Sequence, residues 1–209
     1  MSVLVTGGSG FIGHKVVEEF VKSGVSTIFI DSVEPTSQTD KAIFIRADVL
    51  NLTSLKEIFL NYDMSAVVHL VGLPHIGDCE RDPLLSFQLN VTSVQNVLEA
   101  MRKCDVEKIC FASSASIYGR PTQNPVSEKI PPEPDTVYGC HKLMAEQLIK
   151  AYQKSYSVKA VVFRIFNVYG GDPFRGKDVI SIFIRAALAG EPIVVKGGGK
   201  FRDFIHLED

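Results

Sequence analysis

The stretch Thr6-Gly-Gly-Ser-Gly-Phe-Ile-Gly13 decides the fold of this 209-residue chain. It follows an apolar run at residues 3–6 and opens a helical pattern over residues 11–23. Glycines at 7, 10 and 13 allow a tight turn, close approach of a pyrophosphate to the backbone, and close packing of helix on strand. A glycine turn alone is weak evidence, but with a strand before it and a helix after it we predict a phosphate site at the helix N-terminus.

Outward from this turn, short apolar runs alternate with longer segments of helical period. The runs lie at residues 3–6, 27–30, 42–46, 66–71, 108–113, 160–165 and 193–196, and the helical segments at 11–23, 54–61, 83–103, 139–156 and 178–189. Strands that are apolar throughout are typical of a parallel sheet covered on both faces. The order therefore predicts an α/β protein with a Rossmann-like, doubly wound parallel sheet.

The segment 83–103 is predicted to be one long helix, which Asp82 caps and Pro83 begins. It carries an apolar stripe at helical spacing, while other apolar residues lie off that stripe. Two apolar faces indicate either two partners, the sheet and a second subunit, or a thoroughly buried helix. The stripe consists of Leu84, Phe87, Val91, Val94, Leu98 and Met101, and the residues off it are Leu85, Leu89 and Val97.

The composition of the chain excludes several classes of binding partner. Lys and Arg number 22 against 24 Asp and Glu, so the chain lacks the basic excess of a nucleic-acid binder. Its uncharged apolar runs, such as residues 66–72, are far shorter than the roughly 20 residues that span a bilayer. The four cysteines form no CxxC or Cys/His cluster. We expect no nucleic-acid partner, no membrane, no metal, and a cytoplasmic location.

Asp31 ends the second apolar run at the spacing expected for an acid that binds the adenosine ribose. Its carboxylate would accept hydrogen bonds from both ribose hydroxyls and repel a 2′-phosphate, which favours NAD over NADP. Asp31 before Ser32, and Asp48 after the third run, are also residues typical of turns, so a purely structural role stays open for both.

Tyr138-Gly-Cys-His-Lys142 places a phenol and an ammonium one helical turn apart, so both can face one cleft. Bringing a tyrosine from a pKa near 10 to neutrality requires about 3 pH units, or roughly 4 kcal/mol, which a close cation and an oxidised nicotinamide could supply. Phe111-Ala-Ser-Ser-Ala-Ser-Ile-Tyr-Gly119 ends a strand in hydroxyl groups, at the sheet edge where ligands collect. The two signals converge on one site.

In combination, these motifs resemble the extended short-chain dehydrogenases/reductases of the NAD-dependent epimerase/dehydratase family, and most of all its UDP-glucose 4-epimerases. The resemblance covers essentially the whole chain. It rests on TGGSGFIG at 6–13, Asp31, Asp48-Val49, HLVG at 69–72, Asn90-Val91, FASSASIYG at 111–119, YGCHK at 138–142, RIFNVYG at 164–170 and FRDFIH at 201–206.

The resemblance implies a role for each matching residue. The catalytic residues would be Ser114, Tyr138 and Lys142. The nucleotide sugar would be held by Ser114, Tyr138, Asn167 and Arg202. The NAD site would comprise Gly7, Gly10, Phe11, Ile12, Gly13, Asp31, Ser32, Asp48, Val49, Leu70, Val71, Gly72, Asn90, Tyr138, Lys142 and Phe166.

One position discriminates within the family. Its dehydratases and decarboxylases carry a glutamate where this chain has Ser116, and its GDP-sugar epimerase-reductases use a nearby cysteine and NADPH. We therefore expect NAD-dependent 4-epimerisation of a nucleotide diphosphate sugar of the UDP-glucose/UDP-galactose type through a transient 4-keto intermediate. An epimerase of an N-acetylhexosamine or uronic acid nucleotide, and a non-catalytic NAD-binding regulatory module, stay open as alternatives.

The resemblance also implies a homodimer and two domains. Residues 1–170 would form the NAD-binding Rossmann domain, and residues 171–209 would begin a smaller substrate-binding lobe. Because the segment 201–209 breaks off just after a strand-like run, with no cap or polar tail, we expect that lobe to be incomplete.

Overall fold

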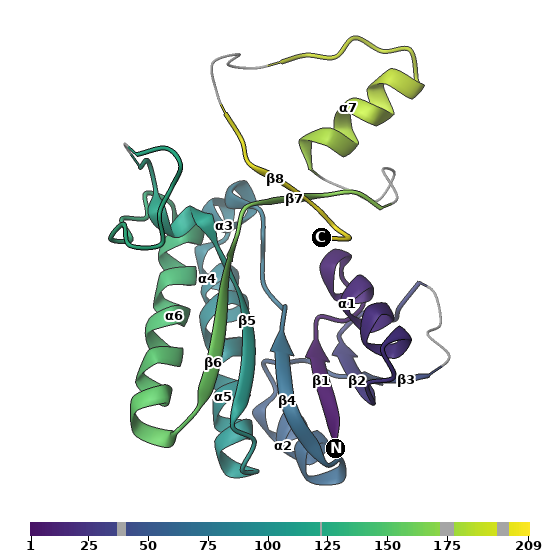
Figure 1. The fold of residues 1–209 in the computed structure, drawn as a ribbon, viewed down its shortest axis with the longest axis vertical. Coiled ribbons are helices and arrows are strands. Elements are labelled where there is room, and N and C mark those ends of the chain that lie inside the picture. Colours follow the sequence, from purple (N-terminus) through teal and green to yellow (C-terminus); the bar gives the residue numbers. More distant parts are fainter. Residues whose placement is uncertain (37–40, 122, 172–177, 196–200) are drawn as a thin grey trace. The chain divides into compact units, whose positions relative to one another are not determined.

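A six-stranded sheet in the order β3-β2-β1-β4-β5-β6 organises the first of two compact units, Met1–Arg164 (Figure 1). The described pairings β1–β2, β1–β4, β2–β3 and β4–β5 are all parallel. This order reverses between β1 and β4, as in a Rossmann fold, which confirms the predicted fold class. The strands are β1 (Ser2–Thr6), β2 (Thr27–Asp31), β3 (Ala42–Arg46), β4 (Met64–His69), β5 (Lys108–Ser114) and β6 (Lys159–Ile165).

This computed structural model describes residues 1–36, 41–121, 123–171, 178–195 and 201–209. Its helices in the first unit are α1 (Phe11–Lys22), α2 (Leu52–Asn61), α3 (Ile76–Arg81), α4 (Pro83–Phe87), α5 (Ser93–Lys103) and α6 (Val137–Tyr156). No helix in these described ranges is long and apolar enough to cross a membrane.

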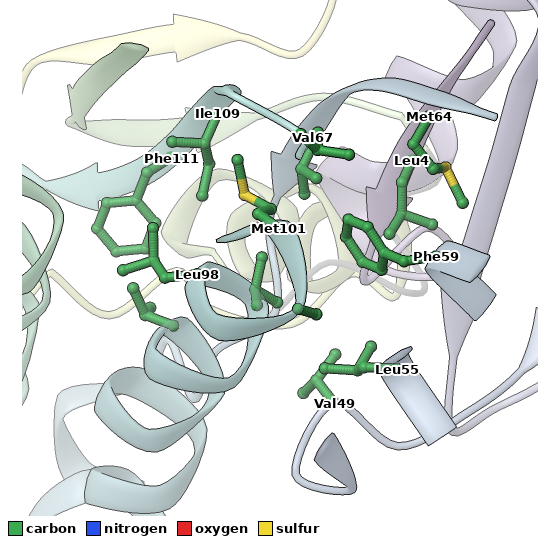
Figure 2. Close-up of a cluster of buried hydrophobic side chains, with 14 of the residues drawn as sticks. Leu4, Val49, Leu55, Phe59, Met64, Val67, Leu98, Met101, Ile109 and Phe111 are labelled. Carbon is green, nitrogen blue, oxygen red and sulfur yellow. The ribbon is translucent and has the colours of Figure 1, made fainter. Parts of the chain in front are cut away.

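Helices cover both faces of the sheet because each strand is apolar on both sides. Val5 and Phe29 pack with Val17 of α1 on one face. The neighbouring residues Leu4 and Ile28 point to the other face, into the main core with α2, α5 and α6. Figure 2 shows this main core, where side chains of α5 meet those of β4 and β5; the labelled residues include Leu98, Met101, Val67, Ile109 and Phe111.

The predicted helix 83–103 is helical throughout but changes hydrogen-bond register. Asp82 caps it as expected, since its Oδ1 accepts from Leu85 N at 2.9 Å. Between α4 and α5 lies a π-helical turn, Gln88–Thr92. A π turn has more residues than an α turn, so it rotates everything after it relative to what precedes it. The alternative of a thoroughly buried helix is wrong, because Leu84 and Phe87 are exposed, whereas Val91, Val94, Leu98 and Met101 are buried.

The second unit, Ile165–Asp209, contains α7 (Val179–Leu188) and two short strands, β7 (Asn167–Tyr169) and β8 (Phe204–His206). The strands pair in parallel, and Asp178 caps α7 by accepting from Ser181 N at 2.9 Å. The strand expected at 193–196 is wrong for residues 193–195, which are irregular and exposed, and residue 196 lies outside the described ranges. Exposed apolar residues without a paired neighbour gain nothing from strand conformation.

Candidate active site

The glycine turn after β1 has the shape of a phosphate-binding loop. The backbone of Gly7 donates to Ile30 O at 2.8 Å, which ties the turn to β2. A Cβ atom at Gly13 would lie 2.0 Å from the Gly7 carbonyl oxygen, so only glycine allows helix and turn to pack this closely. Gly10 caps α1 without any side-chain hydrogen bond, and Phe11 and Ile12 begin the helix. Free N–H groups at this helix N-terminus suit a pyrophosphate.

Asp31 bridges two loops at the end of β2. Its Oδ2 accepts from Ser9 N and its Oδ1 accepts from Val33 N, each at 3.1 Å. A carboxylate has about four acceptor positions, so both the turn-forming role and the ribose-binding role are compatible with this geometry. Asp48 likewise makes a turn, accepting from Leu50 N at 2.9 Å.

A pocket brings predicted cofactor-binding residues together with two further residues, from four separate segments of the chain. Its lining comprises Asp31, Ser32, Ala47, Asp48, Val49, Val71 and Leu89. Apolar side chains together with two carboxylates fit an adenine ring and its ribose. Ala47 and Leu89 were not predicted from the sequence, although Ala47 directly precedes the predicted pair Asp48-Val49. Leu89 comes from the π-helical turn and has no local motif that marks it.

The segment after β4 lies beside the glycine turn. Leu70 N donates to Thr6 O at 3.1 Å, and a Cβ atom at Gly7 would lie 3.0 Å from Val71 N. A Cβ atom at Gly72 would lie 2.6 Å from Asn90 Oδ1 and 3.3 Å from Lys142 Nζ, so this glycine brings the cofactor segment up to the lysine.

Asn90 carries an unpartnered polar atom at this place. The residue is 1% exposed, and its Oδ1 has no hydrogen-bond partner. Its Nδ2 donates to Leu73 O at 3.3 Å, which holds the amide in place. A buried acceptor without a partner costs free energy, and a ligand hydroxyl or amide would remove that cost. The residues present therefore fit the NAD that their motifs indicate.

Three side chains predicted to be catalytic converge where β5 ends and α6 begins. Thr136 caps α6 by accepting from Gly139 N at 3.1 Å, which sets the position of Tyr138. A Cβ atom at Gly139 would lie 2.5 Å from Ser116 O, so this glycine lets α6 approach the serine segment closely. Ser114 Oγ donates to Ser116 Oγ at 3.1 Å, and the Ser114 side chain favours the ionised form of Tyr138. Ser116 N in turn donates to Ser114 Oγ at 3.1 Å.

Lys142 is 4% exposed and lies close to the tyrosine. Its Nζ donates to Ala112 O at 2.9 Å and lies 5.9 Å from the centre of the Tyr138 ring. Burial lowers the pKa of Lys142 to about 8 and raises that of Tyr138, which the Ser114 side chain opposes. The chain alone thus does not lower the tyrosine pKa. The lowering predicted from the sequence required an oxidised nicotinamide in addition to Lys142.

His69 lies at the end of β4, in the interior behind this site. It is fully buried, with Nδ1 2.6 Å from Thr6 Oγ1 and Nε2 3.3 Å from Ser93 Oγ. Burial lowers its pKa to about 3, so the imidazole is neutral. Its role is to tie β1 and β4 to the helix that carries Asn90.

The remaining predicted residues, Phe166, Asn167 and Arg202, belong to the second unit. Asn167 Nδ2 donates to Asp203 O at 2.9 Å, and Arg202 is exposed, with Nη1 donating to Phe201 O at 3.2 Å. Asn167 therefore fixes the residue next to Arg202 within that unit. Their substrate-binding roles stay predictions. Within the described residues no group of three or more His, Cys, Asp or Glu side chains could hold a metal ion.

Fold and site together define a class, the Rossmann-fold short-chain dehydrogenases/reductases with a Ser, Tyr and Lys centre. The model of the NAD-dependent epimerase/dehydratase family matches residues 3–209. The chain belongs to this family.

Individual relatives agree with the family match. A putative UDP-glucose 4-epimerase of Methanocaldococcus jannaschii is 35% identical over 99% of this chain and 70% of the relative. The UDP-glucose 4-epimerase of Thermotoga maritima, solved with UDP-glucose, is similar with a TM-score of 0.93 and 29% identity, over 100% of this chain and 70% of that one. The Thermus thermophilus enzyme, solved with NAD, has a TM-score of 0.89 and 32% identity, over 99% and 71%.

Proposed function

We propose that this chain belongs to an enzyme that uses NAD to epimerise C4 of a nucleotide diphosphate sugar of the UDP-glucose/UDP-galactose type. One observation carries the proposal: Ser114, Tyr138 and Lys142 are buried together at the carboxyl edge of the sheet, beside the segment that leads to the adenosine pocket. A non-catalytic regulatory module would not need this set, because burying an ammonium and a phenol without a reaction to run only costs free energy.

The chain's residues divide the reaction between them. When bound, NAD would supply a reversible hydride acceptor for sugar C4 and a positive ring that favours the phenolate. Tyr138 takes the proton of the sugar 4-hydroxyl as the C4 hydride leaves, so a 4-keto sugar forms without loss of atoms or electrons. Ser114 donates a hydrogen bond to the developing keto oxygen. Lys142 holds the nicotinamide ribose and favours the ionised tyrosine.

The second half reverses these steps on the other face of the sugar. The keto sugar turns in its pocket, C4 regains the hydride, and Tyr138 returns its proton to the oxygen. No net oxidant is consumed. Since Ser116 stands where a dehydratase has its acid, no carboxylate in the segment 111–119 can take the C5 proton.

The test uses the purified chain with NAD and millimolar UDP-glucose, with UDP-galactose measured by proton NMR. Tyr138→Phe keeps the ring and removes the acid/base oxygen, so NAD binding should persist while turnover falls by about 10² or more. UDP-N-acetylglucosamine and UDP-glucuronic acid, run in parallel, decide between the substrate classes. A Tyr138→Phe protein that turns over at the wild-type rate would exclude the tyrosine from the mechanism.

The proposal includes a homodimer. Leu84 is 80% exposed on α4, and Met144 is 46% exposed on α6, a helix that packs against α4. Leu85 and Phe87 extend this apolar face. Burying a large aliphatic side chain contributes about 1.5–3 kcal/mol, so a second copy pairing these helices would gain stability. A reducing, cytoplasmic location belongs to the proposal as well, because all four cysteines are free thiols.

A further inference from the structure

An ion pair not yet given a role lies next to the catalytic segment, between Glu146 of α6 and Arg164 of β6. Arg164 donates from Nη2 to Glu146 Oε2 at 2.9 Å and from Nε to Oε1 at 3.2 Å. Only 9% of the Glu146 side chain and 25% of the Arg164 side chain are exposed. A carboxylate this buried is tolerated only when its hydrogen bonds are made, so the pair has little geometric freedom.

This pair forms hydrogen bonds with both ends of one short segment, Ser113–Tyr118. Ser113 Oγ donates to Glu146 Oε1 at 2.5 Å. At the other end Arg164 Nη1 donates to Tyr118 Oη at 2.8 Å. Ser114 lies between these two hydrogen-bonded residues, so its position depends on both hydrogen bonds.

The same carboxylate belongs to the helix that carries the acid/base residue. Glu146 follows Lys142 by four residues and Tyr138 by eight, so all three project from one side of α6. We propose that the Glu146–Arg164 pair is a positioning device that locks the Ser113–Tyr118 segment to α6 and thereby keeps Ser114 in place beside Tyr138. The proposal rests on the proposed function only in taking Tyr138 as the acid/base group.

A second ion pair in the same unit provides a matched control. Arg102 donates to Glu99 at 3.0 and 2.8 Å, again through two nitrogens, and Glu99 also accepts from the Tyr152 hydroxyl. This pair joins α5 to α6 but has no contact with the Ser113–Tyr118 segment among its described hydrogen bonds. A variant of Glu99 therefore shows the effect of losing a bidentate ion pair alone. A variant of Glu146 also loses the hydrogen bonds that hold the segment of the catalytic serine.

The experiment measures the pKa of Tyr138 by NMR of ¹³C-tyrosine-labelled protein, with and without NAD, assigned by the signal missing in Tyr138→Phe. The variants are Glu146→Gln, Ser113→Ala and Tyr118→Phe, with Glu99→Gln as the control. Tyr138 faces Ser114, Lys142 and Cys79, and none of these is altered. Because the Ser114 side chain favours ionisation of Tyr138, displacement of Ser114 should raise the Tyr138 pKa by about half a pH unit or more.

Rates supply the second readout. In Glu146→Gln and Ser113→Ala we expect kcat for 4-epimerisation to fall about tenfold with KM changed less than about twofold, whereas Glu99→Gln changes neither. If every protein is inactive, the Tyr138 titration, which needs no substrate, decides the positioning role by itself. If Glu146→Gln does not fold, the two variants that remove a single hydroxyl decide. Folded Ser113→Ala and Tyr118→Phe proteins with an unchanged Tyr138 pKa would overturn the proposal.

Discussion

Asp31 uses its two carboxylate oxygens to hold Ser9 and Val33, so the residue that selects the cofactor also shapes the phosphate turn. We expect NAD to bind at least about tenfold more tightly than NADP, a difference of about 1.4 kcal/mol, because a 2′-phosphate would face this carboxylate. Calorimetric titration with both dinucleotides measures the ratio. Equal affinities would refute the assignment.

Two substitutions at this residue separate charge from structure. Asp31→Asn keeps an acceptor for Ser9 N but removes the charge, so the discrimination against NADP should shrink while NAD binding weakens little. Asp31→Ala removes both, and NAD binding should weaken as well, because the turn loses a hydrogen bond of about 1 kcal/mol.

His69 makes the stability of the fold depend on pH. Its pKa falls from 6.5 to about 3 on folding, so between these values the unfolded chain binds a proton that the folded chain does not. The contribution of neutral His69 to the free energy of unfolding is therefore fully present above pH 6.5. It decreases as the pH falls, by up to about 1.4 kcal/mol per pH unit. Urea unfolding from pH 7.5 to 5.0 should show this slope, and His69→Gln should flatten it. An unchanged slope in the variant would assign the effect to other groups.

At the scale of elements, the sequence predicted what is local and continuous. The run Thr27–Ile30 is recognisable as a strand because a strand buried on both faces is apolar throughout. The strands β7 and β8 were not predicted, because a strand of three residues is too short to show a hydrophobic periodicity. The π-helical turn at Gln88–Thr92 was not predicted either. Its hydrogen-bond register is set by the packing around it and not by the helix propensity of its residues.

The candidate site shows the same division. The glycine turn and the Tyr138-to-Lys142 spacing are motifs, so residue spacing alone identifies them. Ala47 and Leu89 line the adenosine pocket only because separate segments meet there, and an apolar residue in such a wall looks like any core residue in the sequence. Asn167 and Arg202 remain predictions based on resemblance.

The exposed face of α4 makes the dimer testable. Leu84 is 80% exposed, so Leu84→Glu should leave the fold of the subunit unchanged while it disrupts helix pairing between copies. Sedimentation at micromolar concentration should show a dimer for the parent chain and a monomer for the variant. Leu60→Glu on α2, where the leucine is 76% exposed, is the control and should stay dimeric. A monomeric parent chain would contradict the proposed dimer.

For the whole molecule, the two units divide the predicted ligand contacts unequally. All the residues assigned to NAD except Phe166 lie in Met1–Arg164, whereas Asn167 and Arg202 lie in Ile165–Asp209. The residues assigned to a nucleotide sugar reach its reacting oxygen and its phosphates, and none is assigned to the base. The chain spans 70% of the length of its Methanocaldococcus jannaschii relative.

We therefore expect NAD to stabilise this 209-residue chain and UDP-glucose to add little. A ligand at 100 times its Kd stabilises the folded state by about 2.7 kcal/mol, which raises the Tm of a unit this size by about 5–10 °C. Thermal unfolding followed by circular dichroism, with NAD, UDP-glucose or both, compares the shifts. Because the base and sugar carry much of the affinity of a nucleotide sugar, a site that binds only its phosphates saturates at far higher concentration. A UDP-glucose shift as large as that of NAD at equal concentration would show that these residues already form a complete nucleotide-sugar site.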